Sequence, residues 1–137
     1  MTPDEVVAGA RLWLGTPYRH RAATLGAGCD CLGLLRGVFG VAGELPVYSA
    51  RWRDDDGRQE LAALARRYLR PAPGPAAGLV ALFRLGATTW PRHCGIFVGP
   101  DRFIHAQEGL GVVEASLGDG WRRRLAGSFS FSLQPGG

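Results

Sequence analysis

The stretch that decides the fold is Gly28-Cys29-Asp30-Cys31-Leu32-Gly33-Leu34-Leu35, written GCDCLGLL. Aspartate commonly caps a helix N-terminus, so Asp30 predicts a helix that begins at Cys31. Apolar side chains recur at the helical period over residues 31–41, which indicates a buried helix. The first turn of that helix favours a thiolate at Cys31, because backbone N–H groups and the helix dipole stabilise negative charge there. Cys29 precedes the helix and lacks this advantage.

Composition indicates one globular domain over residues 1–137, with a loose tail at residues 134–137. Of the 137 residues, 46% are hydrophobic and 20% are charged. No run approaches the roughly 20 apolar residues that a membrane span needs. The first residues carry acidic rather than basic side chains, which is not typical of a secretory signal. We therefore expect synthesis in the cytoplasm without a signal peptide.

Charge and cysteine content exclude some classes of protein. Three cysteines are too few and too odd in number for a disulfide scaffold in a chain of this size. The net charge of +4 comes from arginine, because the sequence contains no lysine, and this excludes a Schiff-base enzyme. A positive charge favours acidic partners. We do not expect nucleic acid to be the main ligand.

Helical patterns fill the first half of the chain and strand patterns the second. Helices are predicted from a Thr2 cap to the Gly15-Thr16-Pro17 stop, over 31–41 and over 58–69, and residues 18–30 are interpreted as a loop. Helices followed by strands predict an α+β domain, with N-terminal helices packed on a C-terminal antiparallel sheet. The predicted strands cover residues 79–84, 93–99, 102–107, 111–115 and 129–133.

Side-chain alternation brings two histidines together. One face of the strand at 93–99 is uniformly apolar, so His93 on the other face is expected to point away from the core. In the next strand, His105 shares a face with Gln107. A hairpin turn between the two strands would place both histidines on the same sheet face, toward the helix that begins with the capped cysteine. This arrangement is typical of a thiol nucleophile with a base and an orienting group.

A zinc site would use the same side chains, namely Cys29, Cys31, His93 and Cys94. Structural zinc usually takes ligand pairs spaced by two to four residues, and Cys-x-Cys is tighter than that. His93 and Cys94 are neighbours on a strand and point to opposite faces. We therefore expect no metal and no cofactor, and Cys94 is expected only to pack in the core. The run Asp54-Asp55-Asp56 is interpreted as a surface loop rather than a cation site.

Four motifs in this order resemble those of the NlpC-type papain-like cysteine peptidases. The helix motif of that family, Asp-Cys-Ser-Gly-Leu, stands here as Asp30-Cys31-Leu32-Gly33-Leu34. Its base motif, His-Val-Gly-Ile, stands as His93-Cys94-Gly95-Ile96, and its third motif as Ile104-His105-Ala106. An upstream Gly-x-Pro-Tyr is present as Gly15-Thr16-Pro17-Tyr18. The resemblance covers about residues 5 to 125.

The resemblance implies a role for each matching residue. Cys31 would attack a carbonyl carbon, His93 would act as the base and His105 would orient it. Tyr18 and the backbone N–H of Cys31 are candidate oxyanion donors. Departures from the usual pattern are Leu32, in place of serine, and the loop that follows Tyr18. Further candidates for contact with the oxyanion or substrate are Asp30, Gln107 and His20.

The implied activity is hydrolysis of an amide bond in the stem peptides of bacterial peptidoglycan. The Gly-Cys-Asp-Cys-Leu-Gly-Leu form in a short chain resembles the subgroup carried by phage tails and gene-transfer-agent particles. In that setting the protein would be bound to tail hub or tail-tip proteins of the particle. It would act on the cell wall or in the periplasm, so that particle DNA can enter the cell. A catalytically idle tail adaptor and an acyl- or amide-transfer enzyme are the alternatives.

Overall fold

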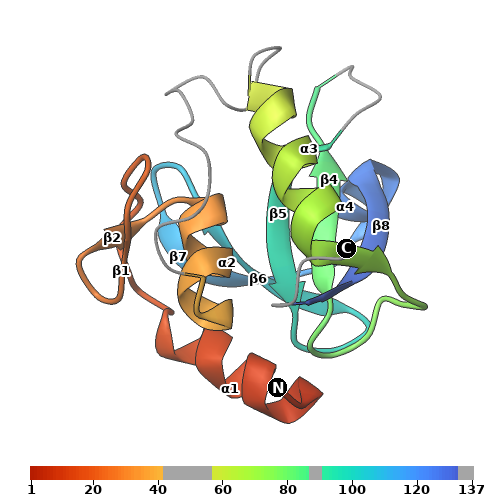
Figure 1. Cartoon of the computed structure of the whole chain (residues 1–137), viewed down its shortest axis with the longest axis horizontal. Helices are drawn as coiled ribbons and strands as arrows, with labels where there is room; N and C mark the ends of the chain where they lie inside the picture. Colours follow the sequence, from red (N-terminus) through yellow and green to blue (C-terminus); the bar gives the residue numbers. More distant parts are fainter. Residues whose placement is uncertain (42–56, 87–90, 133–137) are drawn as a thin grey trace.

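The computed structural model describes residues 1–41, 57–86 and 91–132. Its elements follow the expected order, with helices mostly first and strands mostly second (Figure 1). They are α1 (Pro3–Leu12), β1 (Ala23–Thr24), β2 (Gly28–Cys29), α2 (Cys31–Phe39), α3 (Gly57–Tyr68), β3 (Leu69–Pro71), β4 (Val80–Arg84), β5 (Pro91–Phe97), β6 (Arg102–Gln107), β7 (Gly111–Ser116), α4 (Asp119–Arg124) and β8 (Leu125–Phe131).

The strands β3 to β8 form a six-stranded antiparallel sheet in the order β3-β8-β4-β5-β6-β7. The α+β class and the hairpin between β5 and β6 are therefore confirmed. The predicted start of the last strand is wrong, because β8 begins at Leu125 rather than at residue 129. Residue 133, where that strand was expected to end, and the predicted loose tail lie outside the described residues, as does Asp54-Asp55-Asp56.

Four short elements contradict the sequence interpretation. The strands β1 and β2 pair inside the expected loop at 18–30. Strand β3 pairs with β8 where a connector was expected, and α4 covers residues that were given no element. Each is two to six residues long, too short to show a hydrophobic period.

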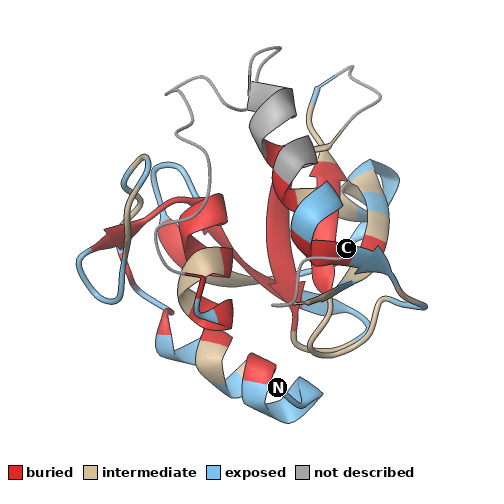
Figure 2. Ribbon diagram, viewed as in Figure 1, coloured by how far each residue is buried: buried red, intermediate tan, exposed pale blue. Residues whose placement is uncertain are grey.

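Much of the central sheet consists of buried residues (Figure 2). Their side chains form an apolar cluster on each face of the sheet. The main cluster joins α1, α2 and α3 to one face, which includes Cys94, Ile96 and Ile104. A second cluster on the other face is built from Ala81, Phe83, Phe97, Phe103 and Leu117, with Trp121 of α4 packed against it. The expectation that His93 points away from the core is therefore wrong in part. His93 points away from the main cluster but is 3% exposed.

Helix α1 has the predicted capping box, in which the Thr2 hydroxyl accepts a bond from the Glu5 N–H and the Glu5 carboxylate accepts one from the Thr2 N–H. The helix ends at Leu12. Leu14, which the sequence pattern placed before the helix stop at Gly15, lies beyond the helix and is 40% exposed. No helix in the described ranges is long and apolar enough to cross a bilayer.

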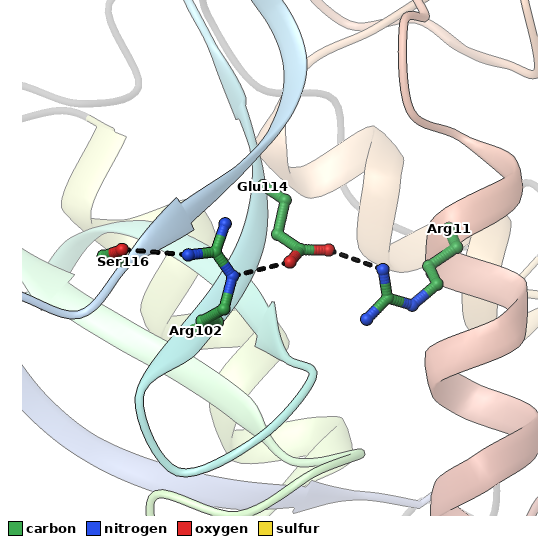
Figure 3. Close-up of polar contacts among 4 residues, drawn as sticks. All are labelled: Arg11, Arg102, Glu114 and Ser116. Carbon is green, nitrogen blue, oxygen red and sulfur yellow. Dashed lines mark hydrogen bonds and ion pairs between the residues drawn. The ribbon is translucent and has the colours of Figure 1, made fainter.

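An ion-pair chain ties α1 to the sheet (Figure 3). Glu114 of β7 accepts a bond of 2.7 Å from Arg11 of α1 and another of 2.7 Å from Arg102 of β6. Arg102 also donates to the Ser116 hydroxyl at 2.9 Å. This contact holds α1 against the edge of the sheet that bears β6 and β7.

Two glycines allow α2 to pack closely, as its buried position predicts. A Cβ at Gly33 would collide with the Ala22 carbonyl, and one at Gly37 would collide with the Trp13 ring. Gly33 thus lets the loop before the helix lie against its first turn. This contact fixes the position of the residue with which the helix begins.

Candidate active site

Asp30 caps α2 and holds the loop in front of it. Its Oδ1 accepts a 2.8 Å bond from the Gly33 N–H, and its Oδ2 accepts a 2.8 Å bond from the Arg21 N–H. The Asp30 side chain is fully buried. The predicted cap is therefore confirmed, and Cys31 is the first residue of the helix. With both oxygens engaged by backbone donors, Asp30 acts in this structure as a scaffold for the cysteine.

Cys31 lies against strand β5 beside the residue that follows His93. The Cys94 thiol donates to the Cys31 carbonyl oxygen at 3.4 Å, and the two side chains are also hydrogen-bonded. Helix α2 packs on the Cys94 face of the sheet, so its first residue lies against the strand that carries His93. Cys94 was expected only to pack in the core, but it also contacts the candidate nucleophile.

The protonation state of Cys31 differs from the expectation. Burial raises the pKa of the Cys31 thiol well above its ordinary value, and the Cys94 thiol and the negative charge of Asp30 raise it further. Burial and Asp30 likewise raise the pKa of Cys29 to about 12. The direction of this shift is opposite to the expectation of an easily ionised Cys31. The thiol is neutral at rest, and attack requires a base.

The two histidines form a hydrogen-bonded pair. Nε2 of His93 lies 2.8 Å from Nδ1 of His105, and the rings are 5.0 Å apart at 79°. Both side chains are buried. Gly95 makes room for the pair, since a Cβ there would lie 3.2 Å from the His105 Cβ and 2.8 Å from the Ile104 carbonyl oxygen. The predicted shared face is confirmed.

His105 is suited to remain uncharged. Burial lowers the pKa of His105 to about 4, so the ring is neutral near pH 7. A neutral imidazole donates through one nitrogen and accepts through the other. Nδ1 of His105 is therefore able to accept a hydrogen bond from His93, as an orienting group does.

The remaining candidates surround the cysteine loop or the end of β6. Tyr18 is half-buried and forms a parallel bridge with Cys29. Nδ1 of His20 lies 3.8 Å from Oδ2 of Asp30, a contact that is ionic when His20 is protonated. Gln107 is exposed at the end of β6, two residues beyond His105. Contacts of these side chains with substrate stay predictions.

Trp121 was missed as a member of the site. Its ring lies 5.9 Å from His93 and 5.2 Å from His105. A cavity of about 410 Å³ lies elsewhere, between the start of α1 and the end of β8, and is lined in part by Val6 and Phe131. Within the described ranges, no three His, Cys, Asp or Glu side chains gather in a way that would hold a metal.

Comparison with known proteins decides the family. Residues 15–129 match the model of the NlpC/P60 family. The chain belongs to the NlpC/P60 family. The NlpC-type resemblance and the papain-like α+β fold are thereby confirmed, whereas the phage-tail subgroup stays a prediction.

Two curated relatives of this NlpC/P60 chain carry names that describe an activity. Murein DD-endopeptidase MepS/Murein LD-carboxypeptidase of Escherichia coli strain K12 is 34% identical over 118 residues, which cover 82% of this chain and 54% of that protein. Gamma-DL-glutamyl hydrolase of Bacillus subtilis strain 168 is 31% identical over 126 residues, which cover 89% of this chain and 28% of that protein. The chain thus spans about half of one relative and less of the other.

Solved NlpC/P60 structures share the fold. The NlpC/P60 domain of the peptidoglycan hydrolase SagA has a TM-score of 0.62 at 22% identity, covering 95% of this chain and 99% of that one. An NlpC/P60 family protein from Bacillus cereus has a TM-score of 0.65 at 19% identity, covering 93% of this chain and 39% of that one. At these identities the likeness supports the fold alone.

Proposed function

We propose that this protein is a cysteine endopeptidase that hydrolyses an amide bond in the stem peptides of peptidoglycan. The observation that carries the proposal is the 2.8 Å contact between His93 and His105 beside the strand residue that touches Cys31. The murein endopeptidase among the relatives supports the substrate class. No cofactor takes part in the proposed reaction.

The proposed chemistry begins with a neutral thiol. The contact with His105 engages Nε2 of His93, so Nδ1 of His93 accepts the thiol proton as Sγ of Cys31 attacks the carbonyl carbon. The same proton then passes to the leaving amine, which departs and leaves a thioester on Cys31. Water attacks the thioester as His93 again takes a proton. The C–S bond then breaks, His93 returns the proton to Sγ of Cys31, and the acid product departs.

Oxyanion stabilisation comes from the start of α2. The Cys31 N–H lies in the first turn, where backbone donors have no acceptor within the helix. Tyr18 is the second proposed donor, because its strand partner Cys29 is two residues from Cys31. Loss of one such donor typically costs about 10²–10³ in rate, so we expect a Tyr18→Phe protein to be slowed by up to that factor.

Digestion of purified sacculi tests the proposal. Wild-type protein should release peptide fragments that mass spectrometry identifies by a new carboxylate and a new amine. A Cys31→Ala protein should lose at least about 10³-fold of this release, because the nucleophile is gone. A Cys29→Ala protein is the matched control, since it also removes a buried cysteine but leaves the helix start intact. Equal release by wild type and Cys31→Ala rejects the nucleophile.

The same assay separates the alternatives. A catalytically idle adaptor releases nothing with any variant. A transferase forms product when an amine or alcohol acceptor is added and little without it. The two relatives differ in the bonds that their names describe, so the masses of the fragments are needed to assign the bond.

We propose further that the protein acts as part of a phage-like tail and opens the wall for entry of particle DNA. The support is the Gly28–Leu34 motif form. Purified particles should then contain the chain among their tail proteins by mass spectrometry. Its recovery exclusively in the particle-free fraction would reject this setting without affecting the proposed hydrolysis.

A further inference from the structure

One tryptophan covers both histidines of the pair. Trp121 of α4 lies 5.2 Å from His105 at 80° and 5.9 Å from His93 at 31°. The same indole packs on Phe83 at 4.9 Å and on Phe103 at 5.2 Å. It therefore joins the histidine pair to the second apolar cluster.

His105 has one ring nitrogen that this packing leaves in an apolar setting. Its Nδ1 contacts His93, whereas its Nε2 is buried and has no hydrogen-bond partner among the residues the structure describes. The nearly perpendicular packing on Trp121 is the edge-to-face geometry that aromatic rings prefer. A ring N–H directed at a π face gains a weak interaction there, while the positive charge that a second ring proton brings would have no solvation.

The charged groups around His105 are few within the described residues. Strand β5 contributes His93, and helix α4 contributes Arg124, whose guanidinium lies 5.7 Å from the Trp121 ring centroid. The other packing partners on this face are apolar, namely Phe103 of β6, Phe83 of β4, and Val113, which is paired with His105 in β7.

The proton positions in the pair decide whether His93 is able to act as a base. When His105 is neutral with its proton on Nε2, its Nδ1 accepts a bond from Nε2–H of His93, and Nδ1 of His93 accepts the thiol proton. When His105 is doubly protonated, its Nδ1–H donates to His93 instead. The His93 proton then moves to Nδ1, and that nitrogen no longer takes a proton from Cys31.

We propose that Trp121 is a positioning residue that excludes water from the histidine pair and thereby keeps His105 in the neutral, Nε2-protonated form. The role in catalysis rests on the proposed function, whereas the effect on His105 does not. Burial already accounts for the lowered pKa of His105, which agrees with this role.

The test compares Trp121→Leu with Trp121→Phe, which retains an aromatic ring. Phe131→Leu is the matched control, because Phe131 stacks on Phe39 at 4.2 Å in the main cluster and does not touch the pair. Imidazole ¹⁵N NMR follows the His105 tautomer and titration, and sacculus digestion follows kcat and KM against pH. Thermal unfolding reports whether each variant is folded.

In Trp121→Leu, the pKa of His105 should rise by at least one pH unit toward its ordinary value, and the acid limb of kcat/KM should shift in the same direction. We expect kcat to fall about 10- to 100-fold with little change in KM, because the base is misplaced rather than the substrate. Trp121→Phe should recover most of both effects, and Phe131→Leu should show neither.

An unchanged His105 titration in folded Trp121→Leu overturns the proposal. A wild-type His105 that carries its proton on Nδ1 overturns it too, even if the leucine variant does not fold. An inactive wild-type protein rejects the proposed function instead, and the NMR titration then still decides the role of Trp121.

Discussion

Protonation of His105 should make the folded protein sensitive to acid. Burial lowers the pKa of His105 to about 4, while the unfolded chain takes up this proton near pH 6.5. Between these values the unfolded state binds more protons than the folded state, so the free energy of unfolding falls as the pH falls. The difference of about 2.5 pH units corresponds to about 3.5 kcal/mol, because each unit is worth about 1.4 kcal/mol, and about 3 kcal/mol of it is lost by pH 4. That is a large share of the roughly 5–15 kcal/mol that stabilises a typical domain.

Urea unfolding at half-unit steps from pH 7 to pH 4 measures this contribution. Carboxylates titrate in the same range, so the useful quantity is the difference between wild type and His105→Gln. The glutamine oxygen is able to accept a bond from His93 but does not titrate. Between pH 7 and pH 4, wild type should lose about 3 kcal/mol more than the variant.

His20→Gln is the control for this experiment, because it removes a histidine that lies in the cysteine loop at 3.8 Å from Asp30. It should retain the steep loss that wild type shows. Parallel pH curves for wild type and His105→Gln would refute the argument, since they would mean that residue 105 titrates alike in the folded and unfolded states.

Three further predictions concern the scaffold of the site. Gly33→Ala should destabilise the protein by about 1–3 kcal/mol in urea unfolding, because the added Cβ meets a backbone carbonyl. Gly9→Ala in α1 should instead stabilise it by about 0.5–1 kcal/mol, because alanine is the better helix former. Equal effects of the two substitutions would contradict this. Glu114→Gln should cost about 1 kcal/mol at low salt and less in 1 M NaCl, and a salt-independent cost would show that the ion pairs are not the cause. Gly95→Ala should separate the histidines and lower kcat about 10²-fold on sacculi; wild-type rates with an intact fold would be inconsistent with the close approach.

The parts of the site that local rules govern were predictable from the sequence. A capping aspartate fixes where a helix begins, and Asp30 placed Cys31 at that point. Strand alternation and a hairpin turn fix which side chains share a face, and they brought His93 and His105 together. The four motifs then predicted an NlpC-type peptidase, and the match to the NlpC/P60 family confirms that family.

The parts that depend on contacts distant in sequence were not predictable. Helix α4 has six residues, a glycine as its N-cap and three arginines, so no apolar period marks it. Its Trp121 nevertheless packs against both histidines and belongs to the apolar residues around the second cluster. Alternation shows which face a side chain is on, but it does not show whether another element covers that face.

The state of the nucleophile is set by competing effects whose sizes only the packed structure reveals. A helix start favours a thiolate, yet Cys31 is 1% exposed and lies beside Asp30, and both conditions raise the pKa of the thiol. A neutral resting thiol should react with iodoacetamide more slowly at pH 7 than a free cysteine, and its rate should still rise well above pH 9. Loss of this reaction in Cys31→Ala, with the rate unchanged in Cys29→Ala, would assign it to Cys31. A rate that reaches its plateau below pH 7 would show a preformed thiolate, and the proton transfer to His93 would then precede substrate binding.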